Sequence, residues 1–283
     1  MLASGPISTV SASGLDAACA RLRSVLVDLG PVVVAFSGGA DSAFLAMAAR
    51  DALGADRALV VTAVSASLAP DELADCRALA DEWQLRWSTV ETDEIHDPTY
   101  VVNDGDRCAS CKSALMDAVA PIASDLGATV VLGVNVDDLG DHRPGQAAAA
   151  ERGARFPLVD AGFTKEMVRA ASQRMGLRTW DKPAAACLAS RIPYGTPVTV
   201  EVLDRVGRAE GRLRRLGFGE VRVRHYGDTA RLEVPLERLT DVVALRAEVV
   251  EAVSSVGYAR VTLDLEGLRS GNLNEDLASP SAP

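Results

Sequence analysis

A strand, a glycine turn and a helix are predicted in immediate succession between residues 31 and 50. The apolar run at 31–36 contains three consecutive valines, and β-branched residues in a short apolar run predict a buried strand. Ser37 and two glycines end that strand, and the alanine-rich segment 43–50 predicts a helix. Because a helix start offers unpaired backbone N–H groups and the positive end of its dipole, this turn predicts a phosphate site.

The turn Ser37-Gly-Gly-Ala-Asp-Ser42 contains the groups that a phosphate-binding loop needs. Glycines let the backbone approach a phosphate without a Cβ in the way, and the two serine hydroxyls add donors. The turn has neither the Gly-Lys-Ser/Thr ending of a Walker A loop nor the Gly-x-Gly-x-x-Gly of a dinucleotide-binding fold. It resembles the PP-loop of ATP pyrophosphatases, which split ATP into AMP and pyrophosphate; an ordinary glycine-rich turn is the alternative. The residues expected to bind the pyrophosphate of ATP are Ser37, Gly38, Gly39, Asp41 and Ser42.

The composition predicts a cytoplasmic, soluble chain with enough apolar residues for one large domain or two smaller ones. It has 283 residues, of which 48% are hydrophobic but only 4% aromatic, so small aliphatic side chains must build the core. A net charge of -10 argues against broad nucleic-acid binding, which requires a basic face. The first ten residues lack a basic and apolar leader, and no apolar run has the length of a membrane span. Five cysteines, an odd number, indicate reduced thiols.

Alternation of strands and helices predicts an α/β fold, in which helices cover both faces of a parallel sheet. The strands are expected at 31–36, 58–64, 86–91 and 130–134, and the helices at 15–29, 43–50 and 70–83. The pattern changes after Arg191, where the connector Ile192-Pro-Tyr-Gly-Thr-Pro197 begins. Beyond it, a smaller α+β domain is expected from helices at 200–216 and 236–253 and strands at 220–225, 229–234 and 258–265. The expected domains are residues 1–191 and 192–275, followed by a tail at 276–283.

Three of the cysteines are candidates for metal or sulfur chemistry. Cys108 and Cys111 form a C-x-x-C pair that is expected in an irregular stretch, and Cys187 follows in a later motif. The surroundings do not resemble thioredoxin, which disfavours a redox pair, and a zinc site would need further ligands. Three thiolates leave one iron of a four-iron cluster open to a sulfide or a substrate. Two small structural cysteines remain the alternative for the pair.

Two groups of charged residues accompany the predicted sheet and hairpin. Asp137 and Asp138 follow Gly133 after a strand, and their oxygens suit the Mg²⁺ that accompanies ATP. A solvated acidic loop is the alternative. In the hairpin, alternation places Arg222 and Arg224 on one face with a third arginine, which indicates either an anion site or a solvent-exposed charged face.

Taken together and in chain order, these motifs resemble the LarE family, the sulfur transferases of nickel-pincer nucleotide synthesis. The resemblance covers about residues 32 to 271. The motifs that carry it are Cys108-x-x-Cys-Lys, Gly133-Val-Asn-Val-Asp-Asp-Leu-Gly-Asp-His-Arg-Pro-Gly, Trp180-Asp-Lys-Pro-Ala-Ala-Ala-Cys-Leu-Ala-Ser-Arg, Ile192-Pro-Tyr-Gly-Thr-Pro, Val221-Arg-Val-Arg-His and Leu263-Asp-Leu-Glu-Gly-Leu-Arg-Ser-Gly.

The resemblance implies that ATP adenylates a carboxylate of a pyridinium dicarboxylate mononucleotide and that sulfur then displaces AMP, giving a thiocarboxylate. Cys187 matches the sulfur position. Members with that cysteine alone give up its sulfur and form dehydroalanine. Because Cys108 and Cys111 are also present, this chain resembles members in which a [4Fe-4S] cluster carries a transferable sulfide. Arg222 and Arg224 match the arginines for the substrate phosphate. A homo-oligomer, a sulfide source and a downstream nickel-insertion protein are the expected partners.

Other functions remain open from the sequence. A PP-loop tRNA thiolase also uses a C-x-x-C pair and a third cysteine, but it needs an RNA-binding surface that the acidic composition does not predict. An amide-forming ligase would use ammonia and would have no use for Cys187. An ATP-sensing binding module of the same fold would release no pyrophosphate.

Overall fold

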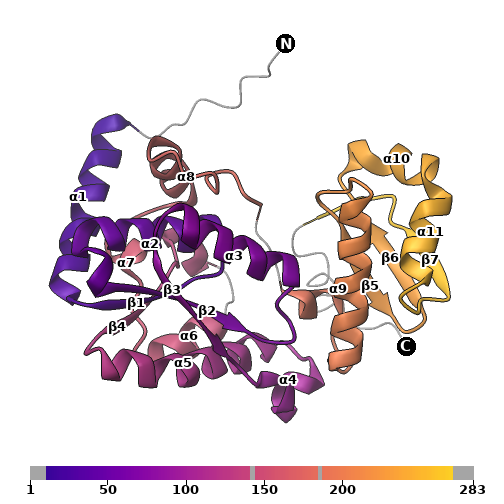
Figure 1. Cartoon of the computed structure of the whole chain (residues 1–283), viewed down its shortest axis with the longest axis horizontal. Coiled ribbons are helices and arrows are strands. Elements are labelled where there is room, and N and C mark those ends of the chain that lie inside the picture. Colours follow the sequence, from indigo (N-terminus) through magenta and orange to yellow (C-terminus); the bar gives the residue numbers. More distant parts are fainter. Residues whose placement is uncertain (1–10, 141–143, 184–186, 270–283) are drawn as a thin grey trace. The chain divides into compact units, whose positions relative to one another are not determined.

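The computed structural model describes residues 11–140, 144–183 and 187–269. The chain forms two compact units from interleaved segments (Figure 1). Unit 1 consists of residues 1–64, 72–93 and 108–185, and unit 2 consists of residues 65–71, 94–107 and 186–283. The predicted tail at 276–283 lies outside the described residues. None of the helices described is both long and apolar enough to cross a lipid bilayer.

Unit 1 is built on a four-stranded sheet with the order β3-β2-β1-β4, and every neighbouring pair of strands is parallel. The strands are β1 (Val32–Ala35), β2 (Ala58–Val64), β3 (Arg86–Glu91) and β4 (Thr129–Leu132). The α/β fold predicted from the sequence is therefore confirmed. Because β1 and β4 are neighbours, the residues that follow their carboxyl ends share one edge of the sheet, where ligands of such folds bind.

Helices cover both faces of this sheet (Figure 1). They are α1 (Ala12–Leu29), α2 (Ala40–Leu53), α3 (Pro70–Glu82), α5 (Arg107–Asp125), α6 (Pro144–Glu151), α7 (Pro157–Asp160) and α8 (Lys165–Arg174). The side chains of successive valines in β1 pack on opposite faces of the sheet. Val32 and Val34 pack into one core cluster with residues of α1, α2, α3 and α8, and Val33 packs into a second cluster with residues of α5 and α6.

Unit 2 has a three-stranded sheet in the order β5-β6-β7. Its strands are β5 (Arg222–Tyr226), β6 (Thr229–Glu233) and β7 (Arg260–Leu263), and its helices are α4 (Pro98–Val102), α9 (Val200–Arg215), α10 (Leu239–Ala244) and α11 (Arg246–Ser254). β5 and β6 form the predicted antiparallel hairpin, whereas β7 pairs parallel to β6. One core cluster of this unit joins Leu213 of α9, Val223 of β5 and Val253 of α11.

The predicted single helix at 236–253 is wrong. A 3₁₀ turn at Leu236–Arg238 leads into α10, and Leu245 with φ -97° and ψ 26° separates α10 from α11. Leu245 packs against the same core as Val242 and Val249. The interruption therefore lets apolar residues of both short helices face one core, although their local sequence is compatible with one continuous helix.

Candidate functional site

The turn after β1 forms a closed loop at the start of α2. Ser42 holds the loop from inside: its hydroxyl accepts from the backbone N–H of Ser37 at 3.2 Å and donates to the Gly39 carbonyl at 3.1 Å. Gly39 is the N-cap of α2, and Asp41 lies in the first turn. The predicted loop residues are therefore placed together at a helix N-terminus, the geometry that binds phosphates.

Gly38 is required by both its conformation and its neighbours. Its φ of +69° is in the left-handed region, which side chains other than glycine rarely adopt. A Cβ at this position would lie 2.9 Å from the Cys76 Sγ and 3.8 Å from the Lys182 Nζ. The loop thus approaches a buried thiol on α3 and an ammonium group at the same time.

Lys182 is a half-buried cation beside the loop. Its Nζ donates to Asp75 at 2.7 Å and to Glu72 at 2.9 Å, both on α3. Burial disfavours the charged form, but the hydrogen bonds to the two carboxylates outweigh it and raise the pKa of Lys182. The ammonium is therefore held charged next to the loop by its two carboxylate partners.

A polar network connects the loop with the residues after β4. The Asn135 side chain donates to Asp41 at 3.0 Å, and the backbone N–H of Asn135 donates to Asp138 at 3.2 Å. Asp138 is buried and forms an ion pair with Lys165 at 3.1 Å. Burial is the main cause that raises the pKa of Asp41. Asp137 is exposed, and its carboxylate accepts from the backbone N–H of Lys165, so the two predicted carboxylates have different surroundings.

Gly133 directly follows β4 and lies against the start of α2. A Cβ there would lie 2.8 Å from the Ser42 backbone nitrogen and 2.9 Å from the Asp41 carbonyl carbon. These are backbone atoms of the first turn of α2, so they cannot move aside as a flexible side chain could. The predicted site residue Gly133 therefore fixes the distance between the two halves of the site.

We expect Gly133→Ala to weaken ATP binding and to lower the free energy of unfolding by about 1–3 kcal/mol, the usual cost of overpacking. The matched control is Gly219→Ala, because a Cβ at Gly219 meets no atom within 4 Å. Calorimetric titration with ATP and thermal unfolding measure the two effects. An alanine at position 133 that leaves both unchanged would contradict the close approach.

The C-x-x-C pair lies on a helix, which corrects the predicted irregular stretch. A turn at Asp104, in which the Asp106 N–H donates to its carboxylate, ends before Arg107, and α5 begins there. The turn therefore ends at Asp106, and Arg107 is the helical residue between the turn and Cys108. Cys108 is exposed and Cys111 half-buried, and their spacing of three residues places both thiols on one face of the first turns of α5.

Cys187 is exposed and is the N-cap of a 3₁₀ turn, η4 (Leu188–Arg191). Arginines bind the carbonyl oxygens of this turn. Arg107 donates to the Ala189 carbonyl at 3.0 Å, Arg224 to the Ser190 carbonyl at 2.6 Å, and Arg191 to the Cys187 carbonyl at 3.4 Å. The turn that presents Cys187 is therefore fixed by cationic side chains.

The hairpin arginines have unequal surroundings. Arg224 and Glu233 are both buried and form a two-point ion pair at 2.8 and 2.9 Å. Arg222 is half-buried and donates to the Arg269 carbonyl, and within the described ranges it forms no ion pair with a carboxylate. Burial is the main cause that lowers the pKa of Arg222, and the neighbouring Arg191 and Arg224 lower it further.

Sequence reasoning missed several functional candidates. No local pattern of the sequence points to Asn135, Lys165 or Arg107. The one available signal was the rarity of lysine, because Lys112, Lys165 and Lys182 are the only three in the chain. Two of them lie beside the loop network. The motif residue Asp141 lies outside the described residues.

Comparison with known proteins gives one family model and three similar proteins. The family model for NAD synthase matches residues 17–109, which include the loop. A Synechocystis protein of uncharacterised function is 46% identical over 93% of this chain and 99% of its own length. An uncharacterised protein from Methanocaldococcus jannaschii is 24% identical over 84% of this chain and 91% of its own length.

A relative with a named activity comes from Lactiplantibacillus plantarum. It is described as pyridinium-3,5-bisthiocarboxylic acid mononucleotide synthase and is 39% identical over 91% of this chain and 94% of its own length. This identity extends over nearly the whole length of both chains. The chain therefore belongs to the LarE-type family of PP-loop synthases.

Proposed function

We propose that this chain is an ATP-dependent sulfur transferase that converts carboxylates of a pyridinium dicarboxylate mononucleotide into thiocarboxylates. The observation that carries the proposal is the near full-length similarity to the synthase named above, in a chain that also has the closed loop and an exposed Cys187. Each part of the reaction can be assigned to residues of this chain.

In the first step, a substrate carboxylate oxygen attacks the α-phosphorus of ATP, and pyrophosphate leaves with the electron pair of the broken P–O bond. Ser37, Gly38, Gly39, Asp41 and Ser42 bind that pyrophosphate. Lys182 and Lys165 are the cationic side chains beside this network, and each is paired with a carboxylate in the structure. Mg²⁺ fits the remaining donor set, because Asp138 and Asp137 offer oxygens and the phosphates of ATP would complete its coordination.

In the second step, sulfur attacks the carbonyl carbon of the acyl adenylate, and AMP leaves as the carbonyl re-forms. If the Cys187 thiolate attacks, a thioester forms first. Loss of the Cys187 Cα proton and cleavage of its Cβ–Sγ bond then release the thiocarboxylate and leave dehydroalanine. This route needs no further reactant, but each protein chain can transfer only one sulfur atom, because Cys187 is consumed.

The three cysteines also suit a [4Fe-4S] cluster. Cys108 and Cys111 share one helix face at the start of α5, and Cys187 is an exposed thiol. In the described ranges no three His, Cys, Asp or Glu side chains are grouped around one metal position, and the third thiol belongs to unit 2. When bound, a cluster with three thiolate ligands supplies an open iron that can hold a sulfide. A sulfide source would then restore it after each transfer, and a nickel-insertion protein would accept the product.

Arg222 and Arg224 are proposed to hold the phosphate of the mononucleotide. We expect Arg222→Ala to raise the KM for the mononucleotide by about 10–100-fold, the loss of one charged hydrogen bond, with little change in the KM for ATP. Arg224→Ala should do the same and also lower the free energy of unfolding by about 3–5 kcal/mol, because it removes the 2.8 Å ion pair of the buried Glu233. Steady-state kinetics and thermal unfolding separate the two variants. Equal effects on both substrates would refute a dedicated phosphate site.

The proposed function predicts that ATP, Mg²⁺ and pyridinium-3,5-dicarboxylate mononucleotide together yield pyrophosphate, AMP and a product in which sulfur replaces oxygen. Mass spectrometry of the product and a pyrophosphate assay measure this directly. Omission of the mononucleotide is the control and should remove pyrophosphate release. Release that instead depends on tRNA would favour a tRNA thiolase, and amide formation with ammonia would favour a ligase.

A further inference from the structure

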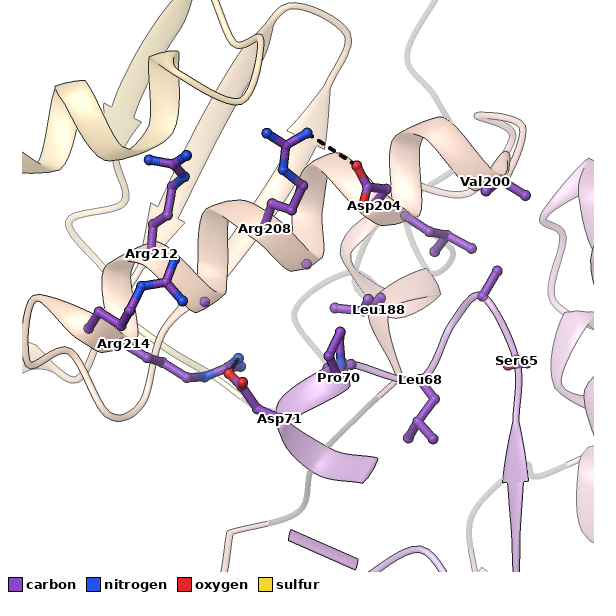
Figure 2. Close-up of a pocket in the computed structure, with 16 residues that line it drawn as sticks. Ser65, Leu68, Pro70, Asp71, Leu188, Val200, Asp204, Arg208, Arg212 and Arg214 are labelled. Atoms are coloured by element: carbon purple, nitrogen blue, oxygen red, sulfur yellow. Dashed lines mark hydrogen bonds and ion pairs between the residues drawn. The ribbon is translucent and has the colours of Figure 1, made fainter. Parts of the chain in front are cut away.

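Unit 2 contains a cavity of about 440 Å³ between α9 and the segment 65–71 (Figure 2). We call it the α9 groove, and its lining includes Leu68, Pro70, Leu188, Val200, Arg212 and Arg214. All of its lining residues belong to unit 2, so its shape depends on that unit alone. No step proposed above uses this groove.

One part of the α9 groove is apolar. Leu188 and Leu203 are buried beneath it, and Leu68 and Val200 add further apolar surface (Figure 2). Two glycines of α9 line the groove. A Cβ at Gly207 would lie 3.0 Å from the Leu188 side chain, and a Cβ at Gly211 would lie 3.7 Å from the Arg215 Nη1 and 3.9 Å from the Asp71 Oδ2, so side chains at either position would narrow the groove.

The other part of the α9 groove is basic. Arg214 binds Asp71 at 3.2 Å and Glu210 at 2.9 Å, and is therefore neutralised. Arg212 and Arg215 also line the groove, and neither forms an ion pair with any residue that the structure describes. The lining of the groove therefore has four arginines against two aspartates, Asp71 and Asp204, which gives an excess of positive charge beside the apolar floor. Guanidinium groups match the geometry of carboxylates and phosphates.

We propose that the α9 groove binds a small anionic amphiphile, with its carboxylate or phosphate at Arg212 and Arg215 and its apolar body over Leu188 and Leu203. The cavity volume is in the range of small-molecule sites, and the combination of an apolar floor with few convergent polar groups is typical of them. The occupant would contact Leu188, which directly follows Cys187 and whose backbone N–H binds the Ser67 carbonyl at 2.9 Å. Binding requires neither ATP nor the mononucleotide, so its failure would leave the proposed function untouched.

The probe for this site is 8-anilinonaphthalene-1-sulfonate, an aromatic anion whose fluorescence rises in apolar surroundings. Titrated into the full-length chain, it should bind one site, and octanoate or octyl phosphate should displace it, whereas octanol should not. If octanoate displaces the probe better than octyl phosphate, the groove prefers a carboxylate; the reverse order indicates that it prefers a phosphate. Absence of displacement by both anions, or equal displacement by octanol, would overturn the proposal.

Variants locate the site. Gly211→Leu fills the groove at a helical position and should abolish probe binding, and the double variant Arg212→Glu, Arg215→Glu should weaken it at least tenfold. Arg246→Glu is the matched control, because Arg246 is an exposed arginine of unit 2 that does not line the groove. Circular dichroism shows whether each variant is folded. If Gly211→Leu is not folded, the double variant alone tests whether the probe binds in the α9 groove. Unchanged binding by the double variant would refute the site.

Discussion

Replacing Cys187 with serine is expected to reduce thiocarboxylate formation to background while pyrophosphate release continues. Cys187 is exposed and its carbonyl, not its thiol, anchors the η4 turn, so the smaller hydroxyl changes the chemistry and leaves the turn in place. A hydroxyl is a much weaker nucleophile than a thiolate and provides no transferable sulfur. Product mass spectrometry and the pyrophosphate assay, run on the same samples, separate sulfur transfer from ATP chemistry.

Cys19→Ser is the matched control for this prediction. Cys19 lies on α1, where burial is the main cause that raises the pKa of its thiol and so disfavours the thiolate. This variant should form thiocarboxylate at the wild-type rate. Thiocarboxylate formation by Cys187→Ser at a normal rate would exclude Cys187 both as the sulfur atom and as an essential ligand.

Iron and acid-labile sulfide, measured on protein purified without oxygen, separate the two sulfur sources. About four of each per chain, lost in Cys187→Ser, would mean that Cys108, Cys111 and Cys187 hold a four-iron cluster and that the enzyme can turn over. Iron-free protein that loses the mass of hydrogen sulfide from Cys187 during the reaction would mean that the cysteine itself is consumed. Cys108 and Cys111 would then need another explanation.

The sheet of unit 1 could be predicted from the sequence because its strands carry local signals. The predicted strands at 58–64 and 86–91 have the ends that β2 and β3 have in the structure. β-branched runs bounded by turn residues determine such strands without help from distant contacts. The glycine turn was predicted for the same reason, since Gly38 and Gly39 lie within the short motif that forms it.

Contacts between distant residues could not be predicted in this way. The pair of Arg107 with Ala189 joins residues 82 positions apart, and that of Asn135 with Asp41 joins residues 94 positions apart. A periodic pattern records which face a residue occupies and not which distant partner it meets. For that reason the sequence identified Arg224 as a possible anion ligand but not its buried pairing with Glu233.

The second large effect is expected at Asp41. Asp41→Ala should reduce pyrophosphate release by at least about 100–1,000-fold, the usual cost of removing one preorganised electrostatic group from an active site. Asp41 lies in the first turn of α2 and binds Asn135, whose backbone N–H in turn holds Asp138. Its removal therefore disturbs both the loop and the carboxylate that we propose for Mg²⁺.

Two further variants support the interpretation of Asp41→Ala: one tests whether the charge or the hydrogen bond of Asp41 matters, and the other is a control elsewhere on the same helix. Asp41→Asn keeps an oxygen that can accept from Asn135 but removes the charge, so inactivity of both variants would assign the effect to the charge. Asp51→Ala removes a carboxylate from the exposed end of the same helix and should release pyrophosphate normally. Normal release by Asp41→Ala would contradict the assigned pyrophosphate site, because no other carboxylate lies within the loop at the start of α2.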